Sequence, residues 1–164
     1  MPKTTDARIA LWNAIESYPA LNPNGTSVFK RKFKHESGEG GTLQTIISTS
    51  LGDMPSIEIL PGRQEFKWQT QRMADFPYNV DVRLVGSRLY RLEQFAQDII
   101  KAAFQQGAGS GMSFIKAATG YNPQSVLVSV PTLARIGDRT QAVKAWAITI
   151  SIGLQFQFDP FGIT

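Results

Sequence analysis

The sequence predicts one α+β domain over residues 1–164, built on a mostly antiparallel β-sheet with two α-helices packed on it and a long C-terminal β-hairpin. Three observations lead to this fold class. Two segments space their apolar residues as a helix does, several others alternate apolar with polar residues, and the longest alternation runs from Lys144 to Phe158. The order helix, strands, helix, hairpin favours an antiparallel sheet that both helices cover. With 164 residues, 42% of them hydrophobic, the chain suits a single core.

The first element is predicted to be a helix. Asp6 suits its first turn, and apolar residues follow at spacings of three and four: Leu11, Ala14, Ile15 and Tyr18. After a turn, the segment Val28 to Lys34 is predicted to be a strand with two phenylalanines on one face and three lysines on the other. Its polar face would then be strongly cationic.

The middle of the chain is predicted to form further strands and the second helix. Leu43 to Thr49 and Ser56 to Leu60 are short strand candidates. From Phe66 to Leu84 the apolar residues fall on even positions, which predicts a longer strand that Pro77 either places at an edge or splits by a bulge. Leu89 to Ala103 carries one apolar stripe, so we expect a helix that lies across the sheet.

The rest of the chain is predicted to form a loop and the hairpin. Residues 107–124 are rich in glycine and are predicted to be irregular, with only a short turn of structure from Met112 to Ala118. Ser125 to Val130 is predicted to be a strand with three valines on one face, and residues 131–142 connect it to the last strand. No alternation in the chain is cleaner than that of the last strand, Lys144 to Phe158.

The length of the last strand indicates a partner. Fifteen residues of strand would span about 50 Å, whereas a compact domain of this size is about 30 to 40 Å across. The strand must therefore bend, with Gly153 as the candidate position, or its end must be covered by another chain. We expect Trp146 to Ile152 in the core of the monomer. The residues that we expect at a subunit interface are Phe66, Trp68, Leu154, Phe156 and Phe158.

The charge of the chain permits a polyanionic partner. Its formal net charge is +4, and the excess is local because Lys30, Arg31, Lys32 and Lys34 fall within five residues. This cluster is predicted to contact DNA or an acidic partner, or else to be a solvated strand face that discourages edge-to-edge pairing. Trp68 lies among basic residues and could stack on single-stranded nucleic acid, but packing in a core or interface is the commoner role of such a residue.

The sequence offers no catalytic, metal or cofactor site. It has no cysteine, its only histidine is His35 in the basic segment, and its acidic residues are scattered singly. Gly107 to Gly111 follows a predicted helix and lacks the spacing of a dinucleotide-binding loop. No segment has the apolar length of a membrane span or the features of a signal peptide, so we expect synthesis in the cytoplasm. An enzyme that uses carboxylates and lysine is the third hypothesis.

The order of elements resembles the phage tail terminator family. The resemblance rests on an N-terminal helix, the strand from Pro55 to Pro61, the strand from Tyr78 to Leu84 leading into the helix from Leu89 to Phe104, and a final hairpin. It implies a hexameric ring in the virion, assembled in the host cytoplasm, that caps the finished tail tube and stops its polymerisation. The ring would join the tube protein to head-completion or connector proteins, and DNA would pass through its lumen without sequence-specific contact. The resemblance implies no catalytic residue and no cofactor.

Two departures from that pattern leave other functions open. The basic strand from Lys30 to Lys34 and the glycine-rich loop after the second helix fit another neck ring or a tail-tube relative equally well. The charge excess supports a different hypothesis, a small basic nucleic-acid-binding module that uses Lys30, Arg31, Lys32, Lys34 and the region of Trp68.

Overall fold

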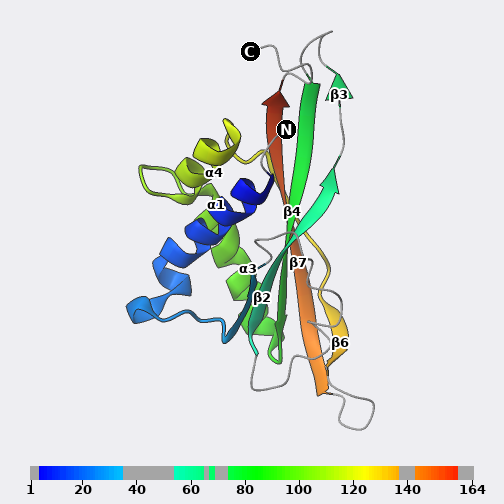
Figure 1. Cartoon of the computed structure of the whole chain (residues 1–164). Coiled ribbons are helices and arrows are strands. Elements are labelled where there is room, and N and C mark those ends of the chain that lie inside the picture. Colours follow the sequence, from blue (N-terminus) through cyan, green and yellow to red (C-terminus); the bar gives the residue numbers. More distant parts are fainter. Residues whose placement is uncertain (1–3, 35–53, 65–66, 69–73, 137–142, 159–164) are drawn as a thin grey trace.

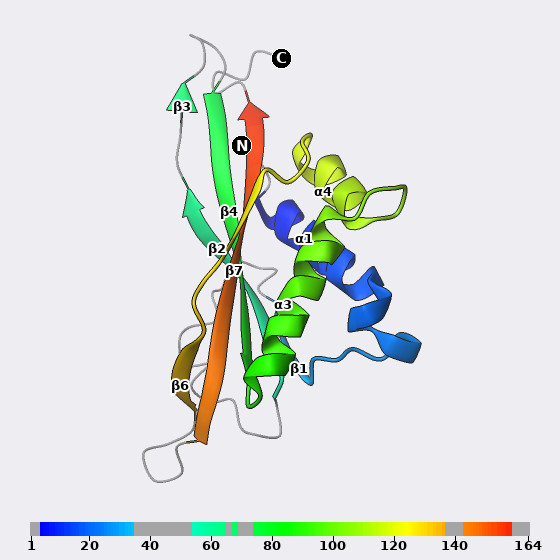
Figure 2. The ribbon, with the colours of Figure 1, turned by 180° about the vertical axis from the view of Figure 1, so that it is seen from behind.

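The computed structural model describes residues 4–34, 54–64, 67–68, 74–136 and 143–158. They form two layers, with a tall twisted sheet on one side and helices α1 (Thr4–Ser17), α3 (Leu89–Phe104) and α4 (Gly111–Thr119) on the other (Figure 1). Seen from behind, all three helices still lie against the same face of the sheet (Figure 2). Two short 3₁₀ turns, η1 (Pro19–Leu21) and η2 (Pro23–Gly25), lead from α1 toward the sheet.

The sheet is mostly antiparallel, as the alternating segments predict. It contains seven strands in the order β1-β2-β4-β7-β5, while β3 pairs with β4 and β6 pairs with β7. Only the pair β1–β2 is parallel. The strand bounds are β1 (Arg31–Lys34), β2 (Ser56–Gln64), β3 (Lys67–Trp68), β4 (Ala74–Gly86), β5 (Ser125–Val128), β6 (Thr132–Ile136) and β7 (Val143–Phe158).

The ribbon formed by β4 and β7 is the axis of the sheet. Every residue of β4 has a partner in β7, from Ala74 opposite Phe158 to Gly86 opposite Trp146. This ribbon of 13 pairs is about 43 Å long. The long predicted strand is thus confirmed, and pairing continues through Gly153, which faces Asn79. A Cβ at Gly153 would overlap Ser125 Oγ, the end of an exposed side chain that can rotate away.

The core lies between the helices and one face of the central strands. Alternate residues of β4 and β7 contribute Tyr78, Val80, Val82, Leu84, Ile148, Ile150, Ile152 and Leu154, all buried. α3 contributes Leu92, Ala96 and Ile99, and α1 contributes Leu11 and Ile15. The apolar residues spaced by three and four in the helices and by two in the strands therefore pack together in one cluster.

The ribbon is longer than the helical layer that covers it. Tyr78 and Leu154 are partners and belong to the core, and strand pairing continues beyond them for four further positions to Ala74 and Phe158. In Figure 1 this end of the ribbon projects above α4, and the end near β6 projects below α3. The helical layer thus covers only the middle of the sheet.

The structure has a third helix where a glycine-rich loop was predicted, so the expectation of two helices is wrong. α4 begins after Ser110 and ends at Gly120, which has φ 85°. Ile115 is fully buried, and Thr119 Oγ1 donates a 2.9 Å hydrogen bond to the Ile115 carbonyl. Close packing of the two helices explains the glycine at position 111. A Cβ on this residue would overlap the Ala102 carbonyl of α3. Tertiary packing therefore outweighs the weak local helix signal.

The predicted C-terminal hairpin exists in a different form. β5 ends at Val128, and a separate strand, β6, lies in the segment that was predicted to be a connection. Pairing moves by one residue between Ser129, bonded to Thr149, and Thr132, opposite Ala147. This shift is a β-bulge, and it includes Pro131, which has no N–H to donate. The hairpin proper is therefore β6–β7.

The predicted strand from Phe66 to Leu84 is instead two strands that reverse direction. β3 and β4 are antiparallel, with Lys67 opposite Asp75 and Trp68 opposite Ala74. β3 continues β2 along the same side of β4. The pair Gln64–Tyr78 at the end of β2 has the same register as the pairs of β3 with β4. The apolar residues of β3 and β4 both fall on even-numbered positions, so the two strands looked like one alternating strand in the sequence.

The contact between α3 and α4 yields a stability test. We expect Gly111→Ala to lower the free energy of unfolding by about 1 to 3 kcal/mol, because the added methyl group must displace the backbone of α3. Urea denaturation measures the change. Ala117→Ser, at an exposed position of the same helix, is the control and should change stability by less than about 0.5 kcal/mol. Equal stability of the Gly111→Ala variant would contradict the close packing.

Candidate functional site

The outer edge of the sheet is formed by β5 and β6, here called the β5–β6 edge (residues 125–136). Both strands pair with β7 on one side, and no strand in the described part of the chain pairs with their other side. Such an edge presents backbone N–H and C=O groups that can pair with another strand. Proteins usually protect it with charged side chains, but residues 125–134 contain none.

The side chains of the β5–β6 edge are aliphatic and exposed. Val130 is 79% exposed, Leu127 73% and Leu133 62%, and Val126 and Val128 are also exposed. Val126 and Val128 lie opposite core residues of β7, whereas Leu127 lies opposite Ser151 on the other face. Both faces of this edge are therefore apolar. A contiguous exposed surface of this kind is typical of a site that another chain covers.

A groove extends the apolar surface from the edge onto α3. It has a volume of about 330 Å³ and lies between α3 and the β5–β6 edge. Its floor contains the buried Ala96 and Ile148, and its walls include Ile100, Val128 and Pro131. Glu93 and Gln97 of α3 supply the polar rim. The edge and the groove together offer a continuous strip for a partner.

The residues predicted at a subunit interface lie in different places in the structure, one in the core and others at the end of the β4–β7 ribbon. Leu154 is 3% exposed and belongs to the core, so the reason for expecting it at an interface does not hold. Trp68 and Phe158 are both partners of Ala74, and Phe156 is the partner of Phe76, so these residues meet at the projecting end of the ribbon. Phe66 lies outside the described residues.

The predicted basic strand is at the opposite edge, in and beside β1. Lys30 and Arg31 are exposed, whereas Lys32 Nζ lies 3.5 Å from Glu16 Oε1 of α1. Lys34 is the partner of Ile59 in the parallel pair with β2. The cationic residues therefore do not form one free strip, because Lys32 is engaged by the helical layer.

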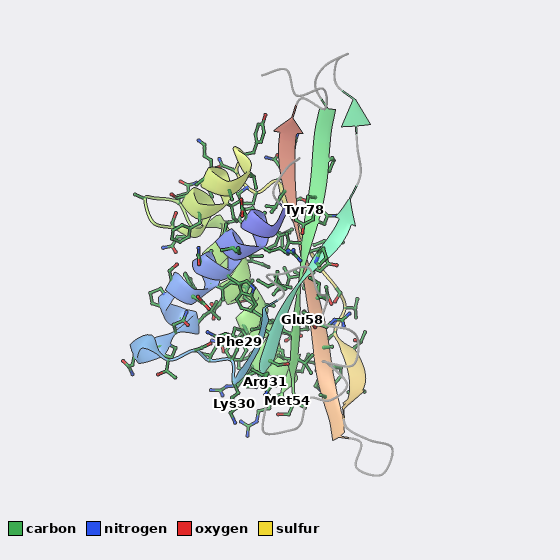
Figure 3. All side chains as sticks on the ribbon, in the orientation of Figure 1. Phe29, Lys30, Arg31, Met54, Glu58 and Tyr78 are labelled. Atoms are coloured by element: carbon green, nitrogen blue, oxygen red, sulfur yellow. The ribbon has the colours of Figure 1, made fainter. Side chains whose placement is uncertain are left out.

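A basic cavity near the start of α3 was not predicted from the sequence. It has a volume of about 170 Å³ and is lined by Lys30 together with Arg88, which directly precedes α3, and Arg91 of α3. Figure 3 shows Lys30, Arg31 and Met54 gathered at this end of the sheet, and Met54 also lines the cavity. The arginines are remote from Lys30 in sequence, so no local charge cluster indicated them.

The exposed edge could have been found in the sequence by one signal. Val126 and Val128 were predicted to lie on one face of a strand, but Leu127 between them makes both faces apolar. A half-buried strand alternates, whereas three successive aliphatic residues at a sheet edge require cover on two faces.

No metal centre is found in the residues that the structure describes. They contain no group of three histidine, cysteine, aspartate or glutamate side chains placed to hold a metal ion. No helix among them is long and apolar enough to cross a bilayer. His35 lies outside the described residues. No protein-family model matches the chain, and no curated protein matches it in sequence.

The division between core and edge can be tested with one substitution at two leucines. We expect Leu154→Ala to lower the free energy of unfolding by about 2 to 5 kcal/mol, because it leaves a cavity in the core. Leu127→Ala makes the same chemical change at an exposed position and should alter stability of the monomer by less than about 0.5 kcal/mol. Chemical denaturation at low protein concentration measures both. Equal losses would show that the two leucines are buried alike.

Proposed function

We propose that the chain is a structural subunit that assembles with copies of itself into a ring. The observation that carries the proposal is the β5–β6 edge, whose open backbone, exposed aliphatic side chains and adjoining groove on α3 form one surface. An incoming segment would pair with the backbone of the edge and cover the aliphatic residues at the same time.

Covering the aliphatic residues of the edge would favour association. Full burial of an aliphatic side chain contributes about 1.5 to 3 kcal/mol. Val130, Leu127 and Leu133 are all more than half exposed in the monomer, so covering them recovers a large part of that amount at each. Backbone hydrogen bonds then specify the register of the added strand.

A ring is favoured over a two-fold dimer because the two edges of the sheet differ. One edge is the short, basic β1 and the other is the aliphatic β5–β6 edge. A contact between unlike surfaces repeats from subunit to subunit and closes into a ring when the rotation permits. The projecting end of the ribbon, with Trp68, Phe156 and Phe158 in its strands, supplies a further contact along the ring axis.

The finer assignment is a tail terminator of a bacteriophage. In this role the ring, a hexamer in the resembling family, sits at the head-proximal end of the tail, caps the tail tube and joins it to the neck or connector proteins. DNA passes through its lumen. The support is the order of elements, with a strand from Ser56 to Gln64 and β4 leading directly into α3. The alternative assignments are another neck ring protein and a tail-tube protein, which would also assemble as rings of identical subunits.

The mass of the assembled protein tests the role of the edge. We expect the wild-type chain to form a closed oligomer in light scattering or native mass spectrometry, and Leu127→Ser with Leu133→Ser to shift it to monomer at the same concentration. Tyr90→Ser is the control, since Tyr90 is 77% exposed on α3 and does not belong to the edge or groove. A wild-type monomer at about millimolar concentration, or equal dissociation of the control, would reject the proposal.

The shape of the oligomer tests the ring. Negative-stain images of the purified protein should show a ring with a central hole, because head-to-tail contacts close around an axis. Discrete two-fold dimers would contradict the head-to-tail contact while leaving the edge as an interface.

A further inference from the structure

We propose that the cavity lined by Lys30, Arg88 and Arg91 is a binding site for a phosphate group of a nucleic-acid backbone. The three side chains come from two separate parts of the chain, the segment before β1 and the beginning of α3. Among the residues that the structure describes, none that lines the cavity is acidic. The inference is independent of the ring, because a monomer carries the same cavity.

The three cations are available to an external anion. None of them forms an ion pair with an acidic residue among those that the structure describes, in contrast to Lys32, which is paired with Glu16. All three residues are exposed at the mouth of the cavity. Three positive side chains around one concave space repel one another, so an anion that binds there relieves this repulsion.

The position of Lys30 is held by contacts on both sides. Its backbone N–H donates a 2.9 Å hydrogen bond to the Pro55 carbonyl. The neighbouring Phe29 is buried and packs edge-on against Phe95 of α3, with ring centroids 5.3 Å apart. Phe95 also lines the cavity. The segment before β1 is thus fixed against α3, which carries Arg91, so its backbone need not be ordered when an anion binds and the entropy cost is that of the exposed side chains.

The floor of the cavity is apolar, and the cations around it are exposed. Met54 and Leu92 are buried and, with Phe95, supply apolar lining beneath the cations. Because the three cations are exposed, their attraction for an anion is screened by water and depends on salt concentration. A volume of about 170 Å³ exceeds that of several water molecules of about 30 Å³ each, which is enough for one phosphate group.

Two features favour a nucleic-acid phosphate over an acidic protein segment. Arginine binds phosphate oxygens in a planar, bidentate manner, and two of the three cations are arginines. Arg31 is exposed next to Lys30 in the chain and extends the positive surface beyond the cavity. A polymer with a phosphate at every nucleotide can occupy the cavity and contact the surface beside it. Such contacts carry no base recognition.

Binding of short labelled DNA tests the site. At about 50 mM salt we expect the wild-type chain to bind single-stranded or duplex DNA of unrelated sequences equally, as measured by fluorescence anisotropy. Arg88→Gln with Arg91→Gln should weaken binding at least about tenfold, because each lost charge-assisted contact costs binding energy. The slope of log affinity against log salt should become shallower by about one to two.

A matched pair of substitutions controls for net charge. Lys101→Gln with Lys116→Gln removes the same charge from exposed positions of α3 and α4 that do not line the cavity. This variant should retain affinity within about threefold of the wild type, as expected for loss of long-range attraction alone. If both double variants weaken binding equally, the cavity has no special role and the site is rejected.

Competition identifies the anion, and oligomeric mass separates this inference from the ring. Inorganic phosphate should displace the DNA only weakly, whereas unlabelled oligonucleotide should displace it fully. Displacement by polyglutamate as effective as that by oligonucleotide would reject the phosphate assignment in favour of an acidic protein segment. Native mass spectrometry should give the Arg88→Gln, Arg91→Gln variant the same mass as the wild type, so a failure of DNA binding and a failure of assembly are distinguished.

Discussion

The pairing of β4 with β7 is the interaction on which the rest of the structure depends. Thirteen successive pairs hold the two strands together, and each strand places alternate residues such as Val82 and Ile150 against the helices. β2 and β3 extend the sheet from one side of this ribbon, and β5 and β6 extend it from the other. Because pleating requires burial of every second residue, the helices need to cover only one face.

The mismatch between this ribbon and its helical cover accounts for the surfaces that remain available. Three helices shield the middle of the ribbon, so its ends and the β5–β6 edge extend past the core. The same geometry places the beginning of α3 at the end of β4, where Arg88 meets the segment that carries Lys30. The aliphatic β5–β6 edge and the cationic cavity near the start of α3 are therefore both found where the sheet extends past the helices.

The strand periodicity allowed much of the fold to be predicted, and the failures share a physical cause. Strand β7 was recognised because period-two burial is a local property. Leu154 was assigned to an interface because the sequence does not reveal how far the helical layer reaches along a strand. α4 was predicted only as a short turn from Met112 to Ala118, because the segment is rich in glycine and Gly111, which has low helix propensity, is retained for its contact with α3. The cavity was missed because Lys30 and Arg91 approach only through tertiary packing.

The position of β7 in the chain has a consequence for how the protein folds. β4 is separated from its main partner by α3, α4, β5 and β6, so the central pairing has a large sequence separation. Folding slows as contacts become less local, because the entropy of closing a long loop is lost before the contacts form. Until β7 is synthesised, one side of β4 has no partner strand, and only α1 and the following helix α3 can cover its apolar face. The order of synthesis therefore leaves the central strand as the segment in greatest need of protection from aggregation.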